Sequence, residues 1–360
     1  MESVGGLMID LSFYKGKKVF ITGHTGFKGT WLCKILINAG AIVTGYSLDI
    51  PTNPSLFELS GIENSITSIR GDIRDLNKLK NAIETSKPDI VFHLAAQPLV
   101  IESYKNPVYT YETNVIGTVN ILECIRISDT VKSFINVTTD KVYQNNEWDR
   151  GYREDDVLNG YDPYSNSKSC SELVTSSYKK SFFTDNHVRI STVRAGNVIG
   201  GGDFAQNRII PDCIRAAIKD EEIIVRNPFS IRPYQHVLEP LFAYLLIAQK
   251  QFENVKYEGN YNIGPDYDDC ITTGEISTIF CKCWGENLKW KNIESDNKVH
   301  EAQFLKLDSS KIKNTFDWKP HWDINKAIEK TVEFGKAYRN NENLSVYMDK
   351  QIKEYMSDNY

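Results

Sequence analysis

The sequence has little that would place it in a membrane or on a nucleic acid. None of its stretches reaches the roughly 18 consecutive apolar residues that a transmembrane helix needs. The opening segment lacks a basic start, and Asp10 interrupts any apolar core, so we expect no signal peptide. The formal net charge is −5 and neither sign forms a long run, which argues against general binding to nucleic acid or anionic membranes. This balance still permits a small anionic ligand in a local basic pocket.

Cysteine pairs at a useful spacing are also lacking. The seven cysteines are odd in number and scattered, which is not the pattern of a disulfide framework. Cys281 and Cys283 have no second Cys or His pair at zinc-binding spacing, so we expect no metal site. Reduced thiols fit a cytoplasmic location best.

What the sequence does have is an alternation of two hydrophobic periods. Strand-like runs lie at 17–22, 41–49, 65–72, 89–96, 133–139 and 189–198. Helical patterns lie between them, at 30–40, 75–86, 111–128 and 164–182. This alternation predicts an α/β fold of the Rossmann type, a doubly wound parallel sheet with helices on both faces.

The rhythm changes after about residue 199, where glycine-rich loops and shorter elements begin. We therefore divide the chain into a nucleotide-binding domain at 1–198, to which 233–264 returns, and a smaller α/β lobe. The smaller lobe comprises 199–232 and 265–360 and is expected to hold the substrate.

A glycine motif follows the first predicted strand. "TGHTGFKGTWL" contains Gly23, Gly26 and Gly29 between a strand and a helix. Glycines there allow a tight turn and let a pyrophosphate approach the helix N-terminus. A glycine-rich turn without a ligand is the alternative interpretation.

Asp49 closes the second predicted strand, twenty residues after Gly29. A carboxylate at this place accepts hydrogen bonds from an adenosine ribose and repels a 2′-phosphate. No Lys or Arg lies between Lys34 and Arg70 to bind such a phosphate, so the pattern favours NAD over NADP. Asp49 is otherwise a turn residue before Pro51.

Two polar clusters lie later in the same domain. "TTDKVYQNNEW" follows the fifth predicted strand, and "YDPYSNSKS" starts a helix on which Tyr164 and Lys168 share one face. A nearby ammonium, aided by an oxidised nicotinamide, stabilises a phenolate and lowers the pKa of tyrosine. The alternatives are a solvated turn for the first cluster and an exposed pair for the second.

Together, the glycine motif, "HLAAQ" at 93–97, Thr139 and the Tyr-x-x-x-Lys pair resemble the extended short-chain dehydrogenase/reductase family. Within it, "TTDKVYQNNEW", "GYREDD", "DPYSNSKSCSEL", "RAGNVIGGGDF" and "RPYQHVLEPL" are most similar to the 4,6-dehydratases that act on CDP-glucose. This resemblance implies tightly bound NAD and the product CDP-4-keto-6-deoxyglucose, a precursor of deoxysugars in lipopolysaccharide O-antigens. The implied cofactor ligands are Gly23, Thr25, Gly26, Phe27, Gly29, Asp49, Asp72, Ile73, Leu94, Ala95, Ala96, Tyr164 and Lys168.

The resemblance also implies roles in three steps: oxidation at C4, loss of water across C5 and C6, and hydride return to C6. Tyr164 would be the base for the C4 hydroxyl, Lys168 would lower its pKa and hold the nicotinamide ribose, and Thr139 would hydrogen-bond the C4 oxygen. Asp140 would be the acid of the elimination. Lys141, where dTDP-glucose enzymes carry Glu, would be the C5 base after a large drop in pKa, or would stay charged and stabilise the enolate.

Residues for the sugar nucleotide are expected beyond the fourth and sixth strands. The candidates are Gln97, Asn197, Arg208, Arg232 and His236, with Arg232 suited to a bidentate phosphate contact. No physical property of these residues distinguishes cytosine from thymine or uracil.

Other functions remain open at this point. A 4,6-dehydratase for dTDP-glucose, a UDP-sugar or GDP-mannose is one, and a sugar-nucleotide 4-epimerase or reductase is another. A non-catalytic NAD(H) sensor is a third. The helices expected at about 108–127 and 163–182 keep an extra apolar face, and the resemblance implies that they form a homodimer or a larger homo-oligomer.

Overall fold

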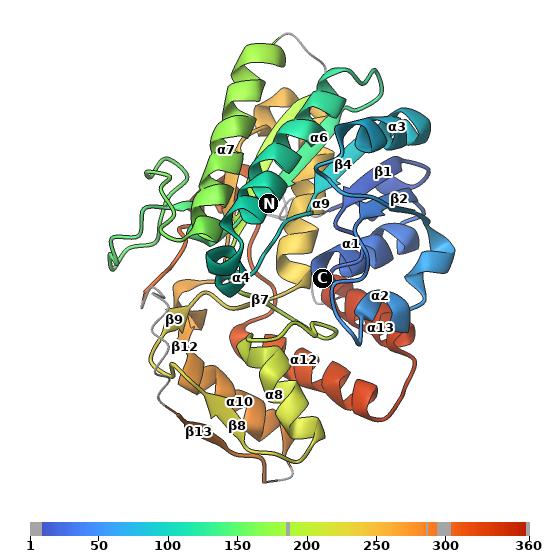
Figure 1. Ribbon diagram of the computed structural model, residues 1–360. Helices are drawn as coiled ribbons and strands as arrows, with labels where there is room; N and C mark the ends of the chain where they lie inside the picture. Colours follow the sequence, from blue (N-terminus) through green and yellow to red (C-terminus); the bar gives the residue numbers. More distant parts are fainter. Residues whose placement is uncertain (1–8, 185–187, 286, 294–303, 358–360) are drawn as a thin grey trace, which may run out of the picture.

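The fold is described by a computed structural model, which covers residues 9–184, 188–285, 287–293 and 304–357. Its centre is a seven-stranded, wholly parallel sheet of order β11-β6-β5-β4-β1-β2-β3 (Figure 1). The strands are β1 (Lys18–Thr22), β2 (Ile42–Ser47), β3 (Thr67–Arg70), β4 (Ile90–His93), β5 (Ser133–Val137), β6 (Arg189–Ala195) and β11 (Asn260–Ile263). The predicted doubly wound sheet is confirmed.

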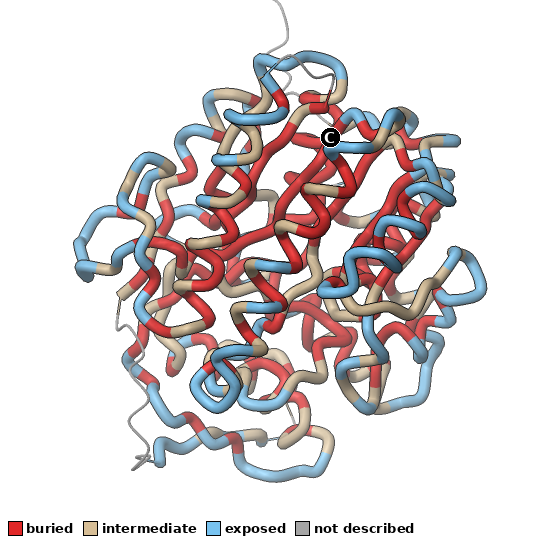
Figure 2. Tube along the Cα trace, turned by 45° about the horizontal axis from the view of Figure 1, so that its top comes forward, coloured by how far each residue is buried: buried red, intermediate tan, exposed pale blue. Residues whose placement is uncertain are grey.

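Helices cover both faces of this sheet because its strands are apolar on both sides. In β4, Val91 joins one core and Phe92 joins the other, as the two-residue period of a strand requires. The first face packs against α3 (Leu76–Ser86) and α6 (Gly117–Arg126), and the second against α1 (Phe27–Asn38) and α9 (Leu238–Glu253). Figure 2 shows the buried strands at the centre and exposed loops around them.

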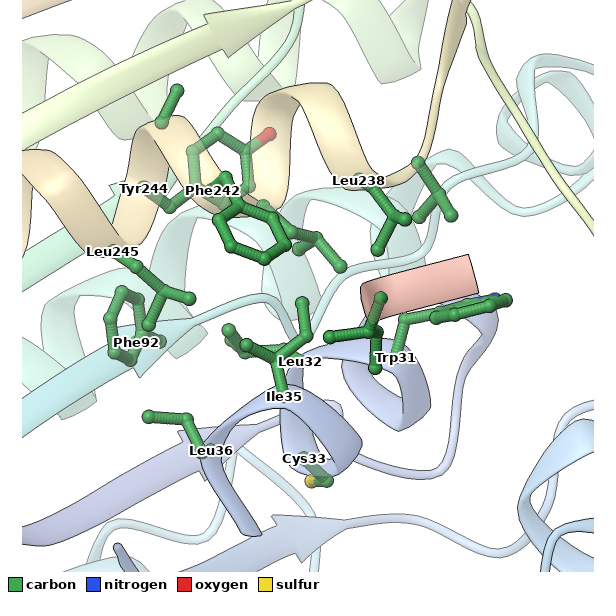
Figure 3. Packing of buried hydrophobic residues seen from close by; sticks show 14 of the residues in the cluster. Trp31, Leu32, Cys33, Ile35, Leu36, Phe92, Leu238, Phe242, Tyr244 and Leu245 are labelled. Atoms are coloured by element: carbon green, nitrogen blue, oxygen red, sulfur yellow. The ribbon is translucent and has the colours of Figure 1, made fainter. Parts of the chain in front are cut away.

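The second core is dense where α1 meets α9. Figure 3 shows side chains of the two helices facing each other beside Phe92, among them Trp31, Leu32, Ile35, Leu238, Phe242, Tyr244 and Leu245. Trp31 also donates a hydrogen bond of 3.0 Å to the carbonyl of Gly201. This bond ties α1 to the loop that follows β7 (Val198–Ile199).

A smaller lobe has a hydrophobic core of its own and lies below the sheet in Figure 1. Its elements are α8 (Ile209–Ile218), β8 (Ile223–Val225), β9 (Ile231–Arg232), β12 (Ile271–Thr272), α10 (Thr273–Trp284), β13 (Trp290–Asn292) and α12 (Ile324–Arg339). β8 pairs with β13 and β9 pairs with β12. The pair β7 (Val198–Ile199) and β10 (Gln235–His236) lies between the lobe and the sheet.

The end of the chain leaves this lobe. α11 (Ser310–Phe316) packs beside β11, and α13 (Leu344–Ser357) packs against α1. Lys34 of α1 and Asp349 of α13 form an ion pair of 2.9 Å. The predicted substrate lobe at 265–360 therefore extends too far, because the final helix covers the nucleotide-binding domain.

The remaining helices are short, apart from α7 (Pro163–Phe182), which packs against α6. They are η1 (Leu11–Tyr14), α2 (Leu56–Leu59), η2 (Ile62–Ser65), α4 (Val100–Lys105), α5 (Pro107–Tyr111), the π-helical η3 (Glu112–Ile116), η4 (Asp140–Val142), η5 (Val255–Tyr257) and η6 (Tyr267–Asp269). Of the helices in the described ranges, none combines the length and apolar character that a bilayer crossing requires.

Candidate active site

The candidate residues gather at the carboxyl edge of the parallel sheet. Because β1, β4, β5 and β6 are neighbours and run in the same direction, the segments that follow them converge at one edge. These segments begin with Gly23, Leu94, Thr138 and Gly196. Tertiary structure thus brings together motifs that lie more than a hundred residues apart.

The glycine turn after β1 is built for close backbone approach. Gly23 has a φ of +77°, and a Cβ there would lie 2.8 Å from the amide nitrogen of Ala95. A Cβ on Gly29 would lie 2.2 Å from the carbonyl oxygen of Gly23. Gly26 caps α1 without a side-chain acceptor, so the first-turn N–H groups face outward. This cradle fits a pyrophosphate, which needs amide donors and no intruding side chain.

On the adenosine side, Asp49 follows β2 as predicted, and its side chain is 98% exposed. Arg70, at the end of the adjacent β3, places its Nε 4.0 Å from Asp49 Oδ1 and donates a bond of 3.2 Å to the carbonyl of Leu48. A cation therefore does lie near the carboxylate that we predict to bind the ribose. Arg70 marks the end of the interval without Lys or Arg from which we predicted that no cation would bind a 2′-phosphate. Only the pairing of β2 with β3 makes Arg70 and Asp49 neighbours.

The other predicted cofactor residues lie along the same edge. Asp72 binds the guanidinium of Arg74 through both carboxylate oxygens, at 2.7 to 3.1 Å. Ile73 is buried, and Leu94, Ala95 and Ala96 are half-buried beside the glycine turn. Thr25 is buried, with its hydroxyl 2.8 Å from that of Ser47, and Phe27 opens α1.

The helix that carries Tyr164 and Lys168 starts as predicted. Asp162 is its N-cap and accepts a bond of 3.0 Å from the amide of Ser165, and Pro163 occupies the first turn. Tyr164 is 9% exposed and Lys168 is 3% exposed. Burial on this scale contradicts the alternative of a solvent-exposed Tyr-Lys pair.

Burial governs the charge of both residues. It raises the pKa of Tyr164 to about 12, although a hydrogen bond with Thr139 acts in the opposite direction. It lowers the pKa of Lys168 to about 8, although the charge of Glu172 opposes this change. The Lys168 ammonium donates a bond of 3.0 Å to the carbonyl of Val137. The expected decrease in the pKa of Tyr164 is therefore not produced by the protein groups alone.

The turn after β5 encloses an acid. Thr139 donates its hydroxyl hydrogen to Asp140 Oδ1 at 3.0 Å, and Asp140 is 1% exposed. Burial raises the pKa of the Asp140 carboxyl, despite the opposing effects of Lys141, Thr139, Arg232 and Lys28. A solvated turn is thus excluded for Asp140, whereas Lys141 is half-buried.

Lys28 is a site residue that we did not predict. It lies in the first turn of α1, and its ammonium is 5.9 Å from the ring centre of buried Tyr244. Burial lowers its pKa to about 8, assisted by the charges of Arg208 and Lys168 and opposed by that of Asp140. Lys28 is part of the glycine motif "TGHTGFKGTWL", but a lysine at this position has no sequence pattern that would indicate a role in the site.

The predicted substrate residues separate into two groups. Asn197 is half-buried after β6, Arg232 is 3% exposed, and Arg208 binds Asp203 at 3.0 Å. The charges of Arg232 and Arg208 act on Asp140 and Tyr164 respectively, so both lie near the reacting centre.

Gln97 and His236 form the second group, because both are engaged inside the protein. The Gln97 side chain donates to Thr110 Oγ1 at 2.9 Å and accepts from the amide of Leu99 at 2.6 Å. His236 is fully buried, and its ring centre lies 6.3 Å from that of Trp31 and 4.8 Å from that of Trp322. These contacts are packing and positioning contacts, and they give no support to substrate binding by either side chain.

In the described part of the chain, no group of three or more His, Cys, Asp or Glu side chains is arranged to hold a metal ion. The site instead combines a glycine cradle with a buried Thr-Tyr-Lys set and several cationic side chains. A doubly wound sheet with this set at its carboxyl edge defines an extended short-chain dehydrogenase/reductase.

Comparisons with known proteins narrow this class. The model of the GDP-mannose 4,6 dehydratase family matches residues 20–331, and the chain belongs to this family. It is 47% identical to the CDP-glucose 4,6-dehydratase of Salmonella typhimurium over 97% of this chain and 99% of that protein. It is 28% identical to the CDP-paratose 2-epimerase of Salmonella typhi over 88% of this chain and 98% of the relative. The resemblance found in the motifs is thus confirmed over nearly the whole chain.

Solved structures confirm the fold. The dTDP-glucose 4,6-dehydratase of Bacillus anthracis, solved with NAD, superposes with a TM-score of 0.76 at 20% identity, covering 89% of this chain and 97% of that one. The UDP-glucose 4-epimerase of Thermus thermophilus, also solved with NAD, gives a TM-score of 0.77 at 22% identity, with coverages of 88% and 98%.

Proposed function

We propose that the protein is an NAD-dependent hydro-lyase that converts CDP-D-glucose to CDP-4-keto-6-deoxy-D-glucose. The observation that carries this proposal is the buried carboxyl of Asp140 between Thr139 and Lys141, beside Tyr164. An epimerase or reductase has no use for an acid and a cation at this position. The 47% identity to a CDP-glucose 4,6-dehydratase supports both the reaction and the nucleotide.

The first step needs a base at the C4 hydroxyl. Tyr164 takes that proton, and Thr139 hydrogen-bonds the C4 oxygen, since its side chain lies close enough to Tyr164 to lower the pKa of the phenol. Lys168 stabilises the phenolate through its positive charge. Bound NAD supplies the hydride acceptor for C4 and the donor for C6, and its positive ring favours ionised Tyr164. The glycine cradle and Asp49 are the groups that would bind its pyrophosphate and its adenosine ribose.

The second step needs an acid for the C6 hydroxyl and a base for the C5 proton, which the C4 ketone has made acidic. Asp140 suits the acid, because a raised pKa favours the protonated form of its carboxyl. Lys141 removes the C5 proton or, if it stays charged, stabilises the enolate. Rate measurements on Lys141→Met and Lys141→Arg separate these roles, since only the second role tolerates arginine.

The diphosphate of the substrate needs cations. We assign this role to Arg232 and Arg208, with Asn197 as an amide donor, because the two arginines act electrostatically on Asp140 and Tyr164. The product belongs to deoxysugar formation for lipopolysaccharide O-antigens, a reaction of the cytoplasm.

We also propose that the enzyme is at least a homodimer. Val108, Ile116 and Leu173 are 70%, 49% and 55% exposed on α5, η3 and α7. Val108 and Ile116 line an apolar surface with Tyr111 that a second copy would cover. Sedimentation analysis tests this assignment, and Val108→Glu should shift the protein toward monomer, while Val255→Glu, at another exposed position, should not.

The first experiment is an incubation of purified protein with CDP-glucose and no added cofactor. A 4-keto-6-deoxy sugar develops absorbance in alkali, so its formation is followed directly. We expect product from CDP-glucose and little from dTDP-, UDP- or GDP-hexoses. Absence of product with every nucleotide, with NAD added and the fold intact, would exclude dehydration and favour a sensor that only binds NAD(H).

A further inference from the structure

Three consecutive residues at the end of β5 contact one face of α7. The Lys168 ammonium donates to the Val137 carbonyl, the Thr138 hydroxyl donates to the Glu172 carboxylate, and the Thr139 side chain lies close enough to Tyr164 to lower its pKa. Residues at positions i, i+4 and i+8 of a helix share a face, so one stripe of α7 meets one short segment of chain. Two of the three pairs belong to the proposed chemistry. The middle pair has no role in it.

The middle pair is part of a complete ion-pair network. Glu172 Oε1 accepts from Thr138 Oγ1 at 2.5 Å and from Arg194 Nε at 2.9 Å. Its Oε2 accepts from Thr192 Oγ1 at 2.7 Å and from Arg194 Nη2 at 3.0 Å. Burial alone would raise the pKa of Glu172, but Arg194 and the two hydroxyls outweigh burial and lower it. Glu172 is therefore a fixed, buried negative charge.

The network continues to the turn that holds the elimination residues. Arg194 donates through Nη1 to Tyr143 Oη at 2.7 Å, and Tyr143 donates to Asn262 Oδ1 at 2.6 Å. Tyr143 directly follows η4 and is 2% exposed. Arg194 thus links α7, through Glu172, with Tyr143, the residue that follows the turn of Asp140 and Lys141.

We propose that Glu172 and Arg194 are positioning residues of the active site. Their ion pair locks the end of β5 against α7, and this lock sets the direction in which Lys168 and Thr139 face the reacting groups. The inference rests on the proposed function, because it assigns these residues to the same site. It does not make either residue a contact of the substrate.

The charge of Glu172 adds a second effect on Lys168. His93 of β4 and Lys28 of α1 also interact electrostatically with this ammonium, which lowers the pKa of both. His93 is buried, and its pKa falls to about 3, so it is neutral in the working range. Glu172 is thus the anion that keeps Lys168 charged, against burial and against Lys28.

The chain supplies a matched pair of variants. Thr138→Val and Thr192→Val each remove one hydroxyl that donates to Glu172, with nearly equal size and burial. Only Thr138 belongs to the segment 137–139, whose other two residues face Lys168 and Tyr164 of α7. A role limited to stability makes the two variants equivalent, whereas positioning makes them differ.

We expect Thr138→Val to lower kcat for CDP-glucose about tenfold at unchanged KM, as loss of a bond to a charged group predicts. It should also weaken binding of NADH, measured by nucleotide fluorescence, because Lys168 is shifted. Thr192→Val should leave both quantities near wild type. Equal effects of the two variants on kcat and on NADH affinity would overturn the proposal.

Glu172→Gln provides a readout that packing alone does not move. Removing the anion lowers the pKa of Lys168, so the alkaline limb of the pH–rate profile should shift to lower pH. An unshifted limb in a folded variant would refute the electrostatic part. If the wild type turns over no sugar nucleotide, the proposed function fails, and the NADH titrations of the matched pair still decide the positioning role.

Discussion

Two buried acids, one on α7 and one in the adjacent turn η4, have pKa values that are shifted in opposite directions. Asp140 and Glu172 are 1% and 3% exposed, yet the pKa of Asp140 is raised and that of Glu172 is lowered. Glu172 accepts four hydrogen bonds, two of them from one guanidinium. Asp140 Oδ1 accepts one bond from Thr139, and no residue in the described ranges hydrogen-bonds its Oδ2.

The difference shows that the donor set, and not burial, determines what a buried carboxyl can do. A carboxylate with a complete donor set and a counter-ion is a structural charge, since its protonation would break the network. A buried carboxyl with an open oxygen has its protonated form favoured, and that oxygen is free to meet a ligand. Substitutions at these and two other acidic sites test this difference.

Asp140→Asn should lower kcat for CDP-glucose by about three orders of magnitude, because general-acid catalysis typically contributes factors of this size. The thermal unfolding temperature should not fall, since the amide replaces a carboxyl that burial already disfavours as an ion. Steady-state kinetics and calorimetry on the same sample measure both quantities. Near-wild-type turnover would show that another group protonates the C6 hydroxyl.

Arg194→Met should give the opposite result, a large loss of stability. Removing one partner leaves Glu172 as an uncompensated buried charge, which typically costs about 3–5 kcal/mol. Denaturant unfolding of the variant and of Arg126→Met, which breaks an exposed pair with Glu123, makes the comparison. If the two variants were equally stable, the network would not be a structural charge pair.

A third buried acid tests whether donors suffice without a counter-ion. Glu239 accepts bonds from the amides of His321 and Trp322 and from Tyr355 Oη, and among the described residues no Lys or Arg pairs with it. Burial raises the pKa of Glu239 to about 7 from its usual 4.5. Between these two pH values the folded protein therefore keeps a proton on Glu239 that the unfolded chain has lost. Its contribution to stability is present at low pH and lost as the pH rises through that window.

The check is the dependence of the unfolding temperature on pH. Between pH 5 and pH 7 the wild type should lose stability relative to Glu239→Gln, because the amide stays neutral throughout. Parallel curves for the two proteins would mean that the three donors hold Glu239 as an ion, as the network does for Glu172.

The smallest effect is expected at an exposed acid. Asp49→Ser should change the free energy of unfolding by less than about 0.5 kcal/mol, since exposed pairs contribute little. It should nevertheless improve binding of NADP relative to NAD, because Arg70 remains beside the position of the 2′-phosphate. Titration with both nucleotides tests this. Arg70→Ala in the same background should remove the gain.

Much of the site was readable because it is encoded locally. The turn at Gly23 to Gly29, the capped start of α7 and the pairing of Tyr164 with Lys168 each depend on residues within one or two helical turns. The alternation of apolar runs likewise determined the doubly wound sheet, since period and length suffice to distinguish strands from helices.

Other features were decided only by tertiary structure, because they depend on which strands are neighbours and on what each side chain meets. The nearness of Arg70 to Asp49, the return of α13 to α1 and the entry of Lys28 into the site have no local signal. Glu172 and Arg194 lie 22 residues apart in two different motifs, and neither motif indicates that the two side chains form an ion pair. Local patterns were thus enough to predict the fold and the candidate reacting groups, whereas the burial and donor sets that distinguish Glu172 from Asp140 arose only when the chain packed.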